Sequence, residues 1–129
     1  MDDFVYIDQF EKATLEPFHH ADHVRVAFAY LCRYPALQAL EKFSAGLKNF
    51  AAARGKDNLY NETITWAFML LVRERMARGG SESWEQFSQQ NPDLLVWKGG
   101  IIDRYYTSET LGSELARRVF VFPDKSLRG

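Results

Sequence analysis

The chain has 129 residues, of which 47% are hydrophobic and 26% charged, and its formal net charge is -1. This length is that of one domain, and the composition matches the globular average, which argues against a disordered or fibrous chain. The balance of 16 basic and 17 acidic side chains lacks the basic excess of nucleic-acid binders, so we expect no nucleic-acid partner. The single cysteine, Cys32, allows no internal disulfide and no thiolate metal cluster.

The first residues, Met1-Asp2-Asp3-Phe4, are acidic and lack the basic and apolar regions of a signal peptide. The longest dense apolar run, Trp66 to Val72, covers about a third of the roughly 20 residues that span a bilayer. We therefore expect a cytoplasmic protein with no membrane partner. The aromatic fraction of 15% is high, and such rings thicken a core, line a pocket or become buried in a homodimer.

The first third of the chain predicts an arm and two helices. Residues 1–15 have mixed periodicity, which predicts an N-terminal arm that is extended or forms a short turn. A first helix is expected over 17–34, because proline is tolerated in a first turn and Pro35 stops the helix. Residues 36–54 carry the clearest apolar stripe of the chain and predict a second helix.

Asn58 and Asn61 are alternative N-caps for a third helix that reaches about Arg78. Its middle, Ile64 to Val72, is apolar nearly all round, which predicts the central, most buried helix. Strand patterns are almost absent, so the sequence predicts an all-α fold over 1–129, a compact single-domain bundle of five to six helices. The remaining elements are helices from Ser83 to before Pro92, from Pro92 to Tyr105 and from Ser108 to Arg118, and a C-terminal tail over 119–129.

All three histidines lie in the segment Phe18-His19-His20-Ala21-Asp22-His23. His20 and His23 are three residues apart, and His19 and His23 four, so either pair shares a helix face with Cβ atoms about 5–6 Å apart. This is close enough to chelate one metal ion, and the positive end of the helix favours the neutral imidazole that a metal needs. The spacing alone leaves open that the histidines are surface residues, capping groups or partners of Asp22.

A second polar cluster opens the third predicted helix. Glu62 is a candidate carboxylate ligand or general base, and hydroxyl groups on Tyr60, Thr63 and Thr65 are candidates to orient a substrate. If these groups point inward, the carboxylate would be partly desolvated beside the imidazoles, which suits catalysis. The structural alternative is that Asn61 caps the helix while Glu62 complements its dipole.

The motifs Phe18-x-His20-x-x-His23 and Tyr60-Asn61-Glu62-Thr63-Ile64-Thr65, with Asn91-Pro92-Asp93-Leu94-Leu95, resemble those of a family of small uncharacterised bacterial helical proteins. The resemblance covers most of the chain from about Leu15 onward. That family usually has histidine at the position of Asn61, which gives an arrangement that looks like a metal site. The resemblance implies that here His19 or Glu62 would have to complete such a site. It implies an architecture and a site location, and no established activity.

Taken together, these observations predict a small-molecule enzyme with one divalent ion, zinc, iron or manganese, held between the first and third helices. The absence of a glycine-rich phosphate loop predicts no nucleotide cofactor. The expected metal ligands are His20, His23 and Glu62, with His19 as an extra ligand. The expected catalytic residues are Glu62, His23, Tyr60 and Thr63. The expected ligand-binding residues are Asn61, Thr65, Trp66, Tyr30 and Arg104.

The reaction stays open at this point, because hydrolysis, isomerisation and oxygen chemistry all suit an ion that activates water or polarises an oxygen. Two alternatives need no metal. One is a non-catalytic module that binds a small ligand or a protein, and the other is an enzyme in which a histidine and Glu62 act as an acid–base pair.

Overall fold

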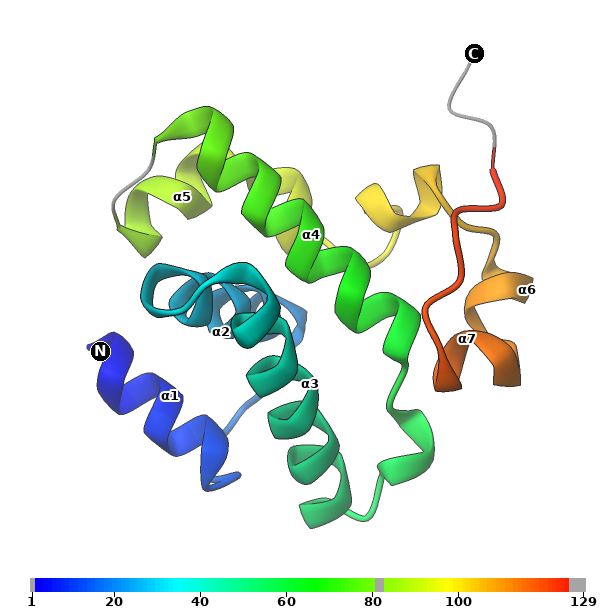
Figure 1. Ribbon diagram of the computed structural model, residues 1–129, viewed down its shortest axis with the longest axis horizontal. Coiled ribbons are helices and arrows are strands. Elements are labelled where there is room, and N and C mark those ends of the chain that lie inside the picture. The colour runs from blue at the N-terminus through cyan, green and yellow to red at the C-terminus, as the bar shows by residue number, and fades with distance from the viewer. Residues whose placement is uncertain (1, 81–82, 126–129) are drawn as a thin grey trace.

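The structure is a computed structural model that describes residues 2–80 and 83–125. Within these ranges the chain forms helices and contains no strand, so the predicted all-α fold is confirmed (Figure 1). None of the described helices is both long and apolar enough to cross a membrane. The helices are α1 (Asp3–Glu11), α2 (His20–Arg33), α3 (Ala36–Ala53), α4 (Glu62–Gly79), α5 (Trp84–Gln90), α6 (Ser108–Leu111) and α7 (Glu114–Arg118), with 3₁₀ helices η1 (Asp57–Leu59), η2 (Pro92–Leu95) and η3 (Ile101–Arg104).

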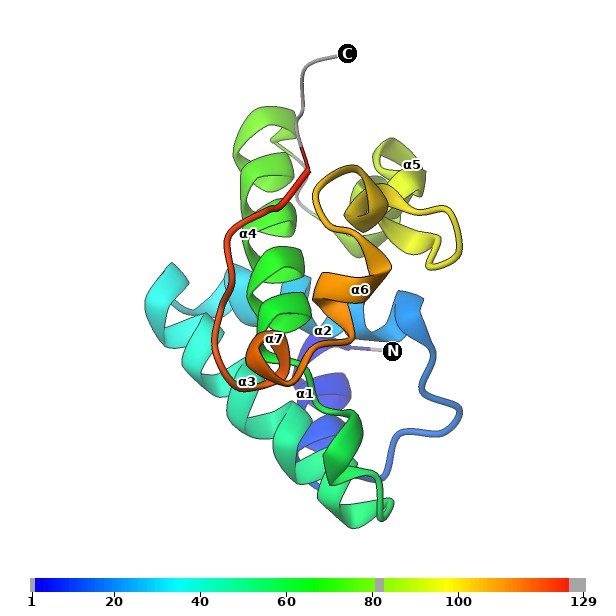
Figure 2. The ribbon, with the colours of Figure 1, turned by 90° about the vertical axis from the view of Figure 1, so that its right-hand side faces the viewer.

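The most enclosed helix is α2, which packs against α1, α3, α4 and α5. Its side chains at Val24 and from Val26 to Tyr30 are buried. The helix α4 was expected to hold this position, but one face packs on α2 and α3 while another faces α7 and the C-terminal segment (Figures 1 and 2). Between these faces Leu70 remains 48% exposed. The apolar residues around α4 therefore serve two separate contacts.

The N-terminal arm predicted over 1–15 is largely helical, as α1. The carboxylate of Asp2 caps this helix by accepting a hydrogen bond from the backbone N–H of Phe4 at 2.7 Å. Phe10 of α1 is fully buried against α3 at Gly46, where an added Cβ would lie 2.8 Å from Cζ of the Phe10 ring. Glycine in mid-helix thus lets α1 approach α3 closely.

Two of the later predicted helices are interrupted. The segment 92–105 forms η2 and η3, and Gly99 between them has a positive φ of 65° that continues no right-handed helix. The segment 108–118 is divided into α6 and α7, because the side chain of Ser113 caps a new helix by accepting a bond from the N–H of Ala116 at 3.1 Å. The helix predicted to begin after Ser83 is confirmed as α5.

Residues 119–125, here termed the C-terminal strap, continue from α7 without helix and run beside α4 (Figure 2). Thr63 Oγ1 donates a hydrogen bond to the carbonyl of Val119 at 2.8 Å and accepts one from the N–H of Val121 at 3.1 Å. The Tyr106 hydroxyl donates to the carbonyl of Val121 at 2.6 Å. The two bonds of Thr63 fix the strap to the first turn of α4, and the bond of Tyr106 fixes it to the segment after η3. Residues 126–129 of the predicted tail lie outside the described residues.

Candidate functional site

A cavity of about 950 Å³ lies between α2, α3, α4 and the loop that precedes α2, and we call it the histidine cavity. Its volume is within the range of roughly 300–1,000 Å³ that is typical of small-molecule sites. All three histidines line it. Much of the remaining wall is aromatic and is formed by Phe18, Phe43, Phe50, Tyr60, Phe68 and Trp97.

His20 lies where the walls from α2 and α4 meet. Its Nε2 is 2.9 Å from the carbonyl oxygen of Leu94 in η2, and because a carbonyl only accepts, this nitrogen carries the proton. The ring centre is 4.6 Å from that of Phe68 and 5.3 Å from that of Trp97. Burial among these groups lowers the pKa of His20 from its ordinary value of 6.5.

His23, one turn further along α2, is the most distinctive polar group of the cavity. Its ring centre lies 4.4 Å from that of Phe18. Burial lowers the pKa of His23 to about 4, and the nearby His20 contributes a smaller part of this shift. Within the described ranges no protein group forms a hydrogen bond with its ring. At neutral pH the cavity therefore presents a neutral imidazole, with one donor and one acceptor available.

His19 is exposed at the edge of the cavity and is the N-cap of α2. Its backbone N–H donates a hydrogen bond to one carboxylate oxygen of Asp22 at 2.9 Å. The other oxygen of Asp22 accepts a bond from the Tyr6 hydroxyl at 2.9 Å. Asp22 therefore stabilises the start of α2 and its packing on α1, and forms no ion pair with a histidine among the described contacts.

Glu62 is directed toward α3 and does not line the histidine cavity. Its Oε1 accepts a hydrogen bond from the Tyr60 hydroxyl and another, at 3.2 Å, from Ser44 Oγ of α3. Ser44 Oγ also lies 2.7 Å from the Tyr60 hydroxyl, which closes a triangle of three polar groups. Burial and the bond to Glu62 raise the pKa of Tyr60 to about 12. The expected meeting of Glu62 with the imidazoles is therefore not seen.

Asn61 and Thr65 line the cavity, but their polar atoms are engaged in structure. The side-chain oxygen of Asn61 accepts a bond from the N–H of Ile64 at 3.0 Å, and its amide nitrogen donates to the carbonyl of Leu111 at 2.7 Å. Thr65 Oγ1 donates to the carbonyl of Asn61 at 2.8 Å. Asn61 therefore caps α4, which is the structural alternative that the sequence left open.

Besides Glu62, four of the predicted site residues do not line the cavity. Thr63 holds the C-terminal strap, because it projects from a different face of α4 than Thr65. Trp66 stacks on Phe120 of the strap at 5.3 Å between ring centres. The two others are Tyr30, whose hydroxyl donates to Glu11 at 2.7 Å, and Arg104, which is exposed at the end of η3.

The predicted metal ligands do not form a three-ligand centre. Among the described residues no group of three or more histidine, cysteine, aspartate or glutamate side chains is arranged to hold an ion. The ring centres of His20 and His23 are 6.4 Å apart, whereas two imidazoles on one tetrahedral zinc have ring centres about 5.3 Å apart. The three expected donors His20, His23 and Glu62 are therefore not gathered at one point. A metal at the histidine pair stays a prediction, which elemental analysis of the purified protein tests.

Sequence reasoning missed how the loop before α2 becomes a cavity wall. The guanidinium of Arg54, at the end of α3, donates bonds to the carbonyls of Ala13 at 3.0 Å and Leu15 at 3.1 Å. It also forms an ion pair with Glu16 at 3.3 Å and lies 4.5 Å from the ring centre of Phe50. Arg54 was not singled out, because nothing in the sequence shows that its partners are carbonyls about 40 residues earlier.

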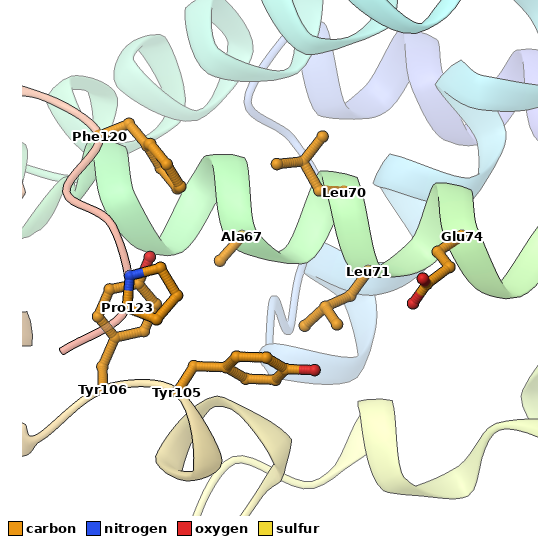
Figure 3. A pocket seen from close by; sticks show the side chains of 8 residues that line it. All are labelled: Ala67, Leu70, Leu71, Glu74, Tyr105, Tyr106, Phe120 and Pro123. Atoms are coloured by element: carbon orange, nitrogen blue, oxygen red, sulfur yellow. The ribbon is translucent and has the colours of Figure 1, made fainter. Parts of the chain in front are cut away.

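A second, smaller cavity of about 230 Å³ lies on the other side of α4, beneath the C-terminal strap. Figure 3 shows Ala67 and Leu71 of α4 facing the ring of Tyr105, with Phe120 and Pro123 of the strap at one end. The only charged side chain of its wall, within the described residues, is Glu74, which pairs with Arg78 at 3.3 Å. This cavity offers few polar groups to a ligand.

Comparison with known proteins adds no relative, since no protein-family model, no curated protein sequence and no solved structure matches the chain. The similarity in motifs to bacterial helical proteins therefore stays a prediction. What can be argued about function depends on the geometry of the histidine cavity.

Proposed function

We propose that this protein binds a small molecule in the histidine cavity, with an apolar, ring-rich body against the aromatic wall and a hydrogen-bonding group at His23. The observation that carries the proposal is the ring of His23, which lines a cavity of about 950 Å³ and has no protein hydrogen-bond partner within the described ranges. His23 is half-buried and its ring nitrogens are not among the fully buried polar atoms, so they are open to a hydrogen-bonding group that enters the cavity.

The aromatic wall supports a ligand of this kind. Phe18 and Phe50 lie 4.4 Å apart between ring centres, and Phe50 lies 5.9 Å from the buried ring of Phe10, so the wall continues into the core. These ring contacts pack this part of the wall against the core, so it is formed before a ligand enters. A site that is already formed loses less free energy on binding than one that must be ordered.

The lowered pKa of His23 favours binding over acid–base catalysis. A general base is most effective when its pKa lies near the working pH, and the pKa of His23 is about 4. At neutral pH the imidazole is instead a constant hydrogen-bonding group. A single-metal enzyme, the first hypothesis from sequence, is supported less than binding because Glu62 is engaged by Tyr60 and Ser44.

The proposal is tested with N-phenylnaphthylamine, an uncharged dye that fluoresces on entering apolar cavities. We expect saturable binding with one dye per chain. Ala51 lines the cavity and Ala52, beside it on α3, is exposed and does not, so the two positions form a matched pair. The substitution Ala51→Trp fills the cavity and is expected to weaken binding at least tenfold, while Ala52→Trp leaves it within twofold.

Binding by the Ala51→Trp protein as strong as by the Ala52→Trp protein would place the dye elsewhere and contradict the proposal, as would no binding by the unmodified protein. Far-UV circular dichroism of the two variants confirms that each remains helical, so that a loss of binding is not a loss of fold.

A further inference from the structure

The charged groups around the histidine cavity are not evenly distributed. Apart from the histidines, the charged side chains that line it within the described ranges are Glu16, Arg54 and Lys56. Glu16 and Arg54 form an ion pair at 3.3 Å, so their charges offset each other. Lys56, which follows α3, is exposed and forms no ion pair among the described contacts. One positive charge is thus left uncompensated at this end of the cavity.

A second cation lies nearby. Nζ of Lys48 is 5.3 Å from the centre of the Tyr60 ring, and Tyr60 lines the cavity together with Lys56 and Leu59. The carboxylate of Glu62, which accepts bonds from Tyr60 and Ser44, does not line the cavity. The part of the wall where His20 and Trp97 meet is uncharged at neutral pH because burial lowers the pKa of His20.

We infer that the ligand of the histidine cavity is an organic acid, with its anionic group at Lys56 and its apolar body extending toward His23 and Trp97. This inference rests on the proposed function and deepens it by naming the charge of the ligand. An anion at the cavity mouth keeps most of its hydration, so the transfer of a charge into the aromatic interior is avoided. The neutral imidazole of His23 then meets an uncharged part of the ligand.

The test compares two dyes that share one ring system. Anilinonaphthalenesulfonate is N-phenylnaphthylamine with one sulfonate added, so a difference between their responses to a mutation reports on the charge. The substitution Lys56→Gln is expected to weaken binding of the sulfonate dye about three- to fivefold, the size of one exposed ion pair, and to leave the uncharged dye unchanged. Added salt is expected to reduce binding of the sulfonate dye by a similar factor in the unmodified protein only.

The matched control is Arg73→Gln, which removes one positive charge from an exposed position of α4 outside the cavity. Binding of both dyes by this variant is expected to equal that of the unmodified protein. If the uncharged dye binds in the cavity but Lys56→Gln affects both dyes equally, or affects neither, the inference of an acid is overturned and the proposed binding function stands. If neither dye binds, the proposed function fails and the inference fails with it.

Discussion

The neutral state of His23 in the folded protein should make stability depend on pH. In the unfolded chain this histidine has an ordinary pKa near 6.5, whereas burial lowers it to about 4 in the fold. Between these values the unfolded state binds a proton that the folded state does not, so the free energy of unfolding falls as the pH is lowered through this window. The linkage relation gives a loss of about 2 kcal/mol between pH 7 and pH 5, and roughly 3 kcal/mol once the pH is below the folded pKa.

The assay is urea unfolding followed by circular dichroism at pH 7, 6 and 5 for the unmodified protein and for His23→Gln. We expect the variant to lose about 2 kcal/mol less stability over this range than the unmodified protein. His20, whose pKa is also lowered by burial, leaves a smaller pH dependence in the variant. The control is His19→Gln, since the side chain of His19 is exposed.

The same pH dependence in His23→Gln and in the unmodified protein would refute this reasoning. It would mean that His23 binds a proton in the folded state as readily as in the unfolded one, and that its ring is solvated rather than enclosed. If the pH dependence disappears in His19→Gln and not in His23→Gln, the effect belongs to His19, and the prediction for His23 is wrong.

Substitutions at three further positions test contacts that hold the fold around the cavity, each by its effect on the free energy of urea unfolding. Asn61→Ala removes the cap of α4 and the bond to the Leu111 carbonyl and is expected to cost about 1–2 kcal/mol, whereas Asn61→Ser, which keeps a capping oxygen and adds no charge, should cost less. Thr63→Val leaves two backbone groups of the strap without partners and should destabilise by about 1–2 kcal/mol, with faster proteolysis of the strap. Gly46→Ala gains about 1 kcal/mol of helix propensity but forces a contact with the Phe10 ring, so a net loss of stability of about 1–2 kcal/mol is expected. A gain in stability would contradict the close packing of α1 on α3.

Local signals in the sequence identified the long helices well. The predicted helix over 36–54 ends within one residue of α3, because Pro35 precedes it and an apolar stripe runs along its length. The choice between two N-caps for α4 was settled by Asn61, whose side chain accepts a bond from Ile64. In each case the residues that define the element are neighbours in the chain.

Elements that depend on distant partners were not predictable. The helix α1 has only three buried residues, and its packing requires Gly46 some 36 positions later, so its own sequence carries little periodic signal. The interruption after η2 coincides with Gly99, whose positive φ lies within the single helix that the sequence predicts from Pro92 to Tyr105. A glycine pair lowers helix propensity, but tertiary packing decides whether the helix continues.

In the candidate site, too, features set by neighbouring residues could be predicted from the sequence, and features set by distant residues could not. The grouping of His20 and His23 on one face could be predicted from their spacing, and both line the cavity. The orientation of Glu62 could not, because it is set by Ser44, a residue of another helix with no recognisable motif. The aromatic wall could not be predicted either, because Phe43 and Phe50 have the helical spacing of ordinary core residues although they line the cavity.

The most direct test of the account is a titration of the protein with N-phenylnaphthylamine, followed by the NMR signals of the three histidine rings. We expect the ring signals of His23 to shift in proportion to occupancy and those of His20 to shift with them, while those of exposed His19 shift least. Saturable binding of the dye that leaves the ring signals of His23 unmoved would contradict it.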